Sequence, residues 1–230
     1  MIYSDPDFGT ITVTVNSRAR RITMRAGADG LRVTVPRYAT HADIASAIEK
    51  YREPLKSQMQ KAREQKHTYD FNYSIETDRL QLHLIPGDKD GFYINRSQGK
   101  CDIVCPRDID FAQHQPRLEK IITEQLRVQA KVILYNRVLE LARLHGFQVS
   151  SIKIQSSRTR WGSCSGRNSI NLSLYLMTLP GRLIDYVILH ELCHTVHHDH
   201  SAQFWHLMDQ VTEGHAQALD REMNQYKTEV

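Results

Sequence analysis

The stretch that decides the fold is Tyr186-Val187-Ile188-Leu189-His190-Glu191-Leu192-Cys193-His194. Its apolar lead-in, followed by the pattern His-Glu-x-x-His, is typical of a helix buried in the core of its domain. On a helix, residues four apart lie about one turn along the axis and about 40° around it. The imidazoles of His190 and His194 should therefore project from one side of the helix, close enough to bind one metal ion.

Glu191 lies about 100° around the same helix from His190, so it can stand beside the ion without binding it. There it can take a proton from a water molecule that the ion activates. This arrangement predicts a zinc hydrolase in which His190 and His194 bind Zn2+ and Glu191 is the catalytic base. The alternative is a chance match, because a chain with 12 histidines produces such a pattern more easily than most.

A catalytic zinc site needs a third protein ligand and an open position for water. Four nearby histidines compete for the position of the third ligand: His197, His198, His200 and His206. His198 continues the same helical stripe, but three ligands on one straight stripe span about two turns, which is too long to surround one ion. Asp199-His200-Ser201 looks like a turn that precedes a new helix. We therefore predict His200 as the third ligand and the other three as polar residues outside the site.

The first part of the chain alternates apolar and polar side chains in short runs, which predicts β-strands with one buried face. These runs lie at residues 10–15, 21–25, 31–35, 69–75, 80–84, 92–94 and 103–104. Between them, Thr40 and Asp43 form a capping box that begins a helix. Pro54 should kink that helix or end it near Glu53. We expect residues 1–112 to form a β-rich domain with one helix.

Helical periodicity dominates residues 113–230, which we expect to form the catalytic domain. A long helix is predicted over residues 116–145, with Gly146 ending it. After a strand and a hairpin comes the helix that carries the metal motif. Pro180 is expected in its first turn, with Thr178 before it as a candidate cap. Two further helices follow Ser201 and residue 215. The fold class is therefore α+β.

The hairpin just before the metal helix contains Arg160-Trp161-Gly162-Ser163-Cys164, a combination that a plain strand does not need. Gly162 permits another group to approach the backbone closely. One interpretation is an exposed strand edge that pairs with an extended peptide substrate. The other is a strand with a buried Trp161 and a glycine bulge. The residues do not decide between them.

The composition is that of an ordinary globular protein, with 40% hydrophobic residues and a net charge of +4. No apolar run reaches the roughly 18 residues that span a bilayer, and no signal peptide is evident, so we expect a cytoplasmic protein without a membrane partner. Cys101 and Cys105 offer only two of the four ligands of a structural zinc site. The cysteines are therefore predicted to be reduced, buried thiols.

Arg18, Arg20, Arg21 and Arg25 form a short basic stretch. Such a stretch is usually a solvated strand face. The alternative is a surface that binds nucleic acid or another acidic partner. Nothing else in the sequence supports this alternative.

These motifs together resemble the YgjP-like metallopeptidase family, a group of zincins. The family pattern is a W-G-S-C hairpin, an H-E-L-x-H helix and an H-S-x-x-F-W segment, which match here at Trp161–Cys164, His190–His194 and His200–Trp205. The resemblance extends over most of the chain and implies a zinc site of His190, His194 and His200 with a catalytic Glu191, in a zincin-like domain. The group looks distantly similar to SprT-like proteases, whose DNA role is not carried over. Asp199 departs from the asparagine that many relatives have before the third histidine.

Hydrolysis of a peptide bond in a peptide or protein substrate is the preferred function. One alternative is a zinc hydrolase that acts on another bond, such as a nucleotide phosphoanhydride. That reaction would require Arg158, Arg160 and Arg167 to converge on the metal and hold phosphates. The second alternative is a metal-binding scaffold without activity, but metal binding alone does not require Glu191.

Overall fold

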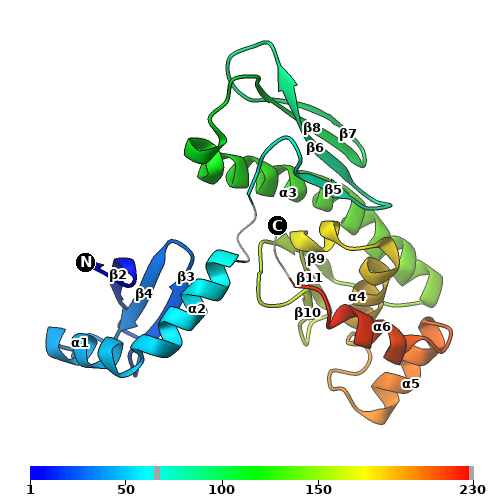
Figure 1. Ribbon diagram of the computed structural model, residues 1–230. Coiled ribbons are helices and arrows are strands. Elements are labelled where there is room, and N and C mark those ends of the chain that lie inside the picture. Colours follow the sequence, from blue (N-terminus) through cyan, green and yellow to red (C-terminus); the bar gives the residue numbers. More distant parts are fainter. Residues whose placement is uncertain (65–67, 228–230) are drawn as a thin grey trace. The chain divides into compact units, whose positions relative to one another are not determined.

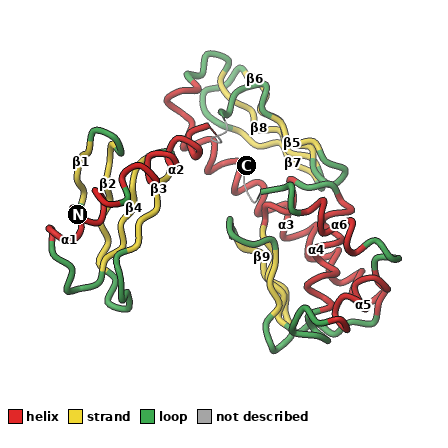
Figure 2. Tube along the Cα trace, turned by 60° about the horizontal axis from the view of Figure 1, so that its bottom comes forward, coloured by secondary structure: helices red, strands yellow, loops and turns green. Residues whose placement is uncertain are grey.

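The computed structural model describes residues 1–64 and 68–227, and the chain divides into two compact units, Met1–His67 and Thr68–Val230 (Figure 1). Each unit has its own hydrophobic core. Both units combine helices with strands, as the colours of Figure 2 show, so the predicted α+β class is confirmed. Among the described residues, none of the helices has the length and apolar character needed to cross a membrane.

The first unit contains a four-stranded sheet in the order β1-β2-β4-β3. Its strands are β1 (Ile2–Asp5), β2 (Gly9–Val15), β3 (Thr23–Gly27) and β4 (Gly30–Val35). β2 and β4 run parallel, whereas β1 and β3 run antiparallel to their neighbours. Ile11, Val13, Leu31 and Val33 are buried, and the side chains between them face solvent, as the alternation predicts.

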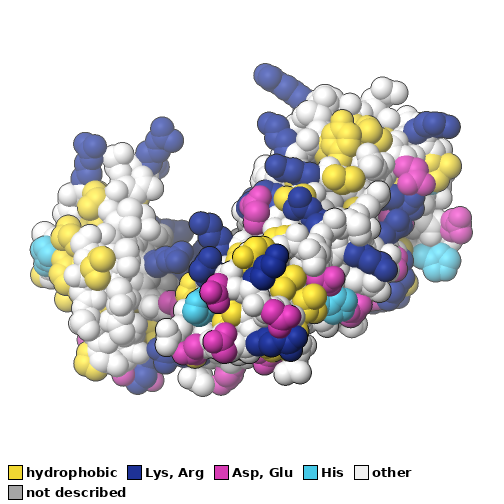
Figure 3. Space-filling view, turned by 90° about the horizontal axis from the view of Figure 1, so that it is seen from above, with side chains coloured by type: hydrophobic (Ala, Val, Ile, Leu, Met, Phe, Trp, Pro, Cys, Tyr) yellow, Lys and Arg dark blue, Asp and Glu magenta, His cyan; other side chains and the backbone are white. Residues whose placement is uncertain are grey.

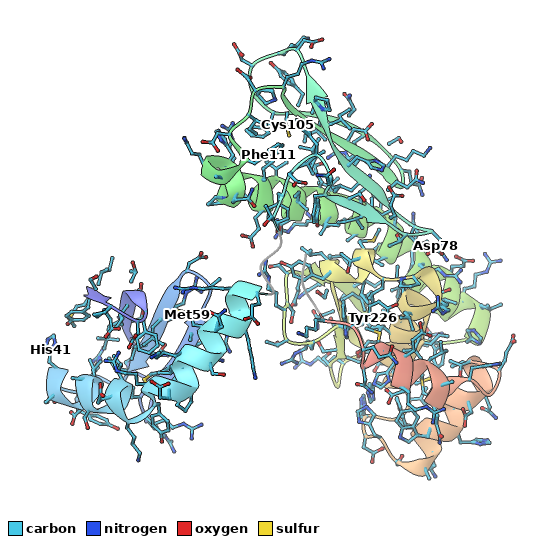
Figure 4. All side chains as sticks on the ribbon, in the orientation of Figure 1. His41, Met59, Asp78, Cys105, Phe111 and Tyr226 are labelled. Carbon is cyan, nitrogen blue, oxygen red and sulfur yellow. The ribbon has the colours of Figure 1, made fainter. Side chains whose placement is uncertain are left out.

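Two helices, α1 (His41–Lys50) and α2 (Arg52–Glu64), share a core with this sheet. Met59, labelled in Figure 4, belongs to the part of α2 that is buried in this core. α1 begins with the predicted capping box: the Asp43 N–H donates to Thr40 Oγ1, and the Thr40 N–H donates to the Asp43 carboxylate. The predicted helix start is therefore found in the structure.

The break between these helices lies slightly earlier than predicted. The prediction placed it near Glu53, whereas α1 ends just before Tyr51 and Pro54 lies in the first turn of α2. In a continuous helix, a proline ring clashes with the carbonyl group four residues before it, which here belongs to Lys50. Pro54 therefore breaks the helix one turn ahead of itself.

The second unit opens with another four-stranded sheet, in the order β5-β6-β8-β7. Its strands are β5 (Ser74–Glu76), β6 (Gln81–Gly87), β7 (Tyr93–Ser97) and β8 (Lys100–Pro106). β5 is shorter than the alternation over residues 69–75 predicts. The backbone of Tyr69 bonds the side chain of Gln115 instead of a strand: its N–H donates to Oε1 and its carbonyl accepts from Nε2, both at 2.9 Å.

The long helix α3 (Phe111–His145) follows this sheet. It begins before the predicted start at Pro116, because Asp110 caps it by accepting a hydrogen bond from the Ala112 N–H at 3.0 Å. It ends where predicted, at Gly146, whose φ of 76° is left-handed.

The two compact units divide between His67 and Thr68, whereas the sequence analysis placed a boundary near residue 112. The reason is a shared core: Leu82 and Cys105 of the sheet lie in one hydrophobic cluster with Leu118 and Ile122 of α3. Figure 4 labels Cys105 on the last strand and Phe111 at the first residue of the helix. The change from strands to helix near residue 112 therefore falls inside the second unit.

A three-stranded sheet comes next, in the order β10-β11-β9. Its strands are β9 (Ser151–Gln155), β10 (Gly162–Cys164) and β11 (Ser169–Ser173). β10 and β11 form the predicted antiparallel hairpin, and β9 runs parallel to β11. A 3-10 helix (Leu174–Thr178) then leads to α4 (Gly181–Cys193), α5 (Ala202–Val211) and α6 (Ala216–Met223).

The start of α4 differs from the prediction. Thr178 does not cap this helix, since its hydroxyl donates to the Tyr175 carbonyl at 2.8 Å, and Pro180 is the residue before the first turn. The Gly181 N–H donates instead to Asp78 Oδ1, 2.6 Å away. Asp78, labelled in Figure 4, comes from the loop between β5 and β6. A carboxylate at this end also complements the helix dipole. The N-terminus of α4 is therefore stabilised by a residue that is distant in sequence.

The four cysteines are free thiols and none forms a disulfide, as predicted. Cys101, Cys105 and Cys193 are buried, and burial raises the pKa of Cys101 and Cys105 to about 11 and that of Cys193 to about 12. These thiols are therefore protonated at neutral pH and act as small packing residues.

Candidate metal centre

α4 brings two histidines to its C-terminal end. The helix is buried along most of its length, and Leu183, Ile188 and Leu192 are fully enclosed. His190 lies in the last turn and His194 is the residue that caps it. Their Nε2 atoms are 3.2 Å apart. The spacing of four residues therefore brings both imidazoles to one side of a rigid element.

His200 reaches the same point from the other side, after the chain has turned. Its Nε2 lies 3.1 Å from Nε2 of His190. The turn that presents it is closed by Asp199, whose Oδ1 accepts a hydrogen bond from the Ser201 N–H at 3.3 Å. One nitrogen from each of the three histidines lies within 4.8 Å of the others. The structure thus brings together His190, His194 and His200.

The three nitrogens fit a tetrahedral metal ion. Zinc–nitrogen bonds of about 2.0–2.1 Å in a tetrahedral site place neighbouring nitrogens about 3.3–3.4 Å apart. The Nε2–Nε2 distances from His190 to His194 and to His200, 3.2 and 3.1 Å, are close to that separation. Nδ1 of His194 also lies 2.9 Å from the His197 carbonyl oxygen. A hydrogen bond from Nδ1–H to that carbonyl leaves the lone pair of Nε2 directed at the cluster.

Burial keeps the histidines on the helix neutral. Burial, together with repulsion from the neighbouring His194 and His200, lowers the pKa of His190 to about 4. The pKa of His194 is also lowered, chiefly by burial. A metal binds the neutral imidazole, so these two residues are in the binding form at neutral pH.

Phe204 forms an apolar wall behind the cluster. It is fully buried, and its ring centroid lies 4.9 Å from that of His190, 4.5 Å from that of His194 and 4.9 Å from that of His200. Trp205 stands farther out, 6.4 Å from the ring of His200. No role in the site was predicted for Phe204. The signal in the sequence is its spacing: Phe204 follows His200 by four residues across the start of α5, so the two side chains can face each other.

Glu191 is buried beside the histidines, with only 6% of its surface exposed. Burial raises its pKa to about 7, although the charge of Arg160 opposes the rise. Among the described residues, its Oε2 has no hydrogen-bond partner. A buried carboxylate oxygen without a partner is costly unless it has a ligand to meet. Glu191 therefore combines a raised pKa with a carboxylate oxygen that no described protein group contacts by hydrogen bond.

The structure shows why the hairpin has a glycine at position 162. A Cβ atom on Gly162 would lie 2.6 Å from Oε1 and 2.7 Å from Cγ of Glu191. The glycine predicted to permit a close approach therefore makes room for the acidic side chain. β10 is an edge strand, as one of the two sequence interpretations requires, and Trp161 is half-buried.

The competing histidines lie outside the cluster. His198 and His206 are exposed, and Nε2 of His206 is 3.2 Å from the Gln210 side chain. His197 contributes its backbone carbonyl to His194. The ring centroid of Tyr186 is 6.1 Å from that of His190, but its hydroxyl donates to Asp220 Oδ1 of α6 at 2.9 Å.

The three arginines near the hairpin do not form a common phosphate pocket. Arg158 bonds Tyr175 Oη at 2.9 Å and Glu119 at 2.8 Å, so its charge is already partnered. Arg160 interacts electrostatically with Glu191. Arg167 lies in the hairpin turn, where its carbonyl accepts from Ser150 Oγ. This arrangement does not favour a nucleotide substrate.

Comparison with known proteins agrees with the motifs. A family model described as YgjP-like, metallopeptidase domain, matches residues 20–226. Among solved structures, the metallopeptidase zymogen of Pyrococcus abyssi abylysin is similar, with a TM-score of 0.36 and 22% sequence identity over 40% of this chain and 93% of that chain. The search of curated proteins found no match.

Proposed function

The chain belongs to the YgjP-like metallopeptidase family, and from this premise we propose that it is a zinc peptidase that uses Glu191 as its base. Membership confirms the family resemblance seen in the motifs, and establishes a metal-dependent peptidase in general. The finer proposal assigns Zn2+ to His190, His194 and His200. It is carried by one observation: three imidazole nitrogens converge at the spacing of zinc ligands, next to a buried carboxylate.

Zinc, when bound, would supply Lewis acidity at the scissile carbonyl and the attacking water. Glu191 accepts a proton from that water and passes it to the leaving amine. Its burial supports this role, because a raised pKa makes the carboxylate more basic. Burial also offsets the lowering of the pKa that a nearby cation imposes.

The edge strand β10 supports a peptide substrate. β10 pairs with β11 on one side, with Gly162 opposite Leu172 and Cys164 opposite Ile170. Its other edge can hydrogen bond to an extended peptide. Since the space in front of the Gly162 Cα is filled by the Glu191 side chain, where a Cβ atom would lie 2.6 Å from Oε1, a peptide on this edge would pass beside the base.

Metal content is the first test of the site. Mass spectrometry of the purified protein should find about one zinc ion per chain. His200→Ala should lose most of it, whereas His206→Ala, a nearby exposed histidine, should keep it. A wild-type protein that binds no zinc even when zinc is supplied would contradict the proposal. Full zinc retention by His200→Ala would move the third ligand to another residue.

Activity is the second test. The zinc-loaded protein should cleave a labelled, unfolded protein substrate, and Glu191→Gln should lower kcat by about 10²–10⁴-fold while retaining zinc. Nucleoside triphosphates in parallel assays should not be hydrolysed. Hydrolysis of nucleotides but not of peptides would replace the proposed substrate class, and equal activity of Glu191→Gln would remove the proposed base.

A further inference from the structure

The positive charge of the chain is concentrated in its first unit. Residues 1–67 contain 12 Lys and Arg against 7 Asp and Glu, a net charge of +5, whereas the whole chain contains 30 against 26, a net charge of +4. Residues 68–230, which include the candidate metal centre, therefore carry a net charge of −1. A basic excess of this density attracts polyanions, and the proposed peptidase chemistry does not use it.

Within the first unit, acidic residues pair with two cations of the helices. Arg52 pairs with Asp5, Asp7 and Glu49, and Lys56 pairs with Asp7. A second set of cations is exposed and, within the described residues 1–64, takes part in none of the ion pairs: Arg18, Arg20, Arg21, Arg25, Arg32 and Arg37. Lys and Arg side chains project from the first unit, at the left of Figure 3. Their charge is available to a ligand.

Two of these arginines face each other on the solvent side of the sheet. The register of β3 and β4 makes Arg25 and Arg32 direct cross-strand partners, and Thr12 of β2 lies opposite Arg32 on its other side. Like charges directly opposite each other destabilise a sheet. The fold gains nothing from this pair, whereas a phosphate bound between the two guanidinium groups would relieve the repulsion.

A depression of about 280 Å³ lies at this point of the sheet. Its lining includes both arginines, Thr10 and Thr12, together with the carboxylate of Asp29, so the charged side chains around it (two Arg and one Asp) sum to +1. Gly30 closes one end, where a Cβ atom would lie 2.3 Å from the Thr10 carbonyl oxygen. Arginine and threonine are common phosphate-binding side chains. The depression therefore has the chemistry of a site for a phosphate group.

An aromatic ring stands beyond the end of β4. Tyr38 is 74% exposed, yet its hydroxyl donates to the Arg20 carbonyl at 2.7 Å. The ring is therefore anchored within the basic loop while its surface stays open to solvent. Exposed aromatic rings among arginines are the stacking surfaces of single-stranded nucleic-acid sites.

We propose that the solvent face of the β1-β2-β4-β3 sheet binds single-stranded nucleic acid. Phosphates of the strand sit at Arg25 and Arg32, and a base stacks on Tyr38. The anchored ring favours this ligand over an acidic peptide or an anionic membrane, which have no base to stack. A duplex keeps its bases stacked internally and would not use the ring. This proposal does not rest on the proposed peptidase activity.

The test measures binding of the full-length protein to a labelled oligothymidylate or oligouridylate of about 20 nucleotides, longer than a typical single-strand site. Fluorescence anisotropy over about 50–200 mM salt gives the affinity and its salt dependence. Arg25→Ala/Arg32→Ala should weaken binding at least about tenfold and lower the slope of log K against log salt by about 1.4, since each phosphate contact contributes about 0.7. Tyr38→Ala should weaken binding about fivefold or more and leave the slope unchanged.

Lys50→Ala/Lys61→Ala is the matched control, because it removes the same charge from exposed positions on the helices. It should keep the affinity within about twofold and leave most of the slope intact. Equal losses in this control and in the arginine variant would show a response to net charge alone and overturn the proposal. So would an absence of binding by the wild type.

Other partners form the remaining arms of the test. Duplex DNA, polyglutamate and phosphatidylserine vesicles should bind more weakly than the single strand. Equal or tighter binding of one of them, lost in the arginine variant and unaffected by Tyr38→Ala, would assign the surface to that partner and overturn the proposal. Circular dichroism checks folding. Arg25→Lys/Arg32→Lys keeps the charge, so it should preserve the salt slope if the alanine variant does not fold.

Discussion

The two sides of the candidate metal centre are built differently. His190, Glu191 and His194 lie at the end of the buried helix α4, where burial shifts the pKa of each one. His200 lies on an exposed turn that the Asp199–Ser201 hydrogen bond closes. The helix side has a fixed geometry set by the core. The turn side depends on that hydrogen bond and on the packing of the His200 ring against Phe204.

This difference separates two properties of the site, the placement of the base and the completeness of the ligand set. The helix side holds the base and two ligands in place whether or not a metal is present, because the surrounding core fixes the helix. The turn side completes the ligand set and can adjust with little disturbance to the core. Changes on the helix side that spare its two ligands should therefore affect catalysis and stability, and changes on the turn side should affect metal affinity alone.

The largest effect is expected where the two sides touch. Phe204 packs against rings from both sides and is fully buried. Phe204→Ala should lower the free energy of unfolding by about 3–5 kcal/mol. Zinc affinity should fall with it, because all three imidazoles lose the same wall. Urea denaturation in chelator gives the first quantity, and competition with a zinc indicator gives the second.

Met208→Ala is the matched control for this prediction. Met208 is fully buried one turn farther along α5. Its truncation should cost about 2–5 kcal/mol and leave zinc affinity near the wild-type value. If zinc affinity falls equally in both variants, general loss of stability and not the ring contacts controls the site.

The next effect isolates the helix side. A Cβ atom on Gly162 would lie 2.6 Å from Glu191 Oε1, so Gly162→Ala must displace the carboxylate. A displacement of about 1 Å can lower the rate about 10²-fold. We expect that loss in kcat/KM for a peptide, with zinc content unchanged. Gly166→Ala is the control, since open space surrounds Gly166 in the same hairpin. An equal loss in both variants would refute the steric explanation.

Local spacing explains which parts of this site were predictable. His190 and His194 share a helix face because their separation alone sets it, and a cap such as Thr40 with Asp43 is equally local. The contact of Gly162 with Glu191 was only partly visible: the glycine predicted a close approach without naming the partner. The spacing of Phe204 from His200 is local, but its contacts with the rings of His190 and His194 depend on packing between α5 and α4. The bond of Asp78 to the start of α4 likewise joins segments far apart in sequence, which no local pattern contains.

A smaller effect on the helix side depends on pH. Burial raises the pKa of Glu191 to about 7 in the folded, metal-free protein. Protonated Glu191 therefore stabilises the fold relative to the unfolded chain. This stabilisation is fully present below the pKa that glutamate has in the unfolded chain, about 4.3, and is lost as the pH rises through about 7. Glu191→Gln removes this dependence. Relative to wild type, its free energy of unfolding in chelator should therefore rise from pH 5 to pH 8, by an amount on the order of 1–3 kcal/mol.

His190 changes stability in the opposite direction. Burial lowers its pKa to about 4, so its contribution is complete above the unfolded value of about 6.5 and is lost as the pH falls toward 4. Comparing Glu191→Gln with wild type at each pH cancels this effect, because His190 is present in both. A difference that stays constant between pH 5 and pH 8 would show that Glu191 is ionised normally inside the fold.

The smallest effect concerns the turn side. It is the converse of Gly162→Ala, since metal affinity should change and the catalytic rate should not. The hydrogen bond of Asp199 with Ser201 closes the turn and lowers the pKa of the Asp199 carboxyl. Asp199→Ala should weaken zinc binding about tenfold. The kcat of the zinc-loaded enzyme should stay unchanged, because Glu191 and Gly162 keep their contact. Asp199→Asn retains an acceptor oxygen and should bind zinc nearly as well as wild type. If it loses as much affinity as Asp199→Ala, the charge of Asp199 acts on the bound cation, and the turn side contributes electrostatically as well as through its shape.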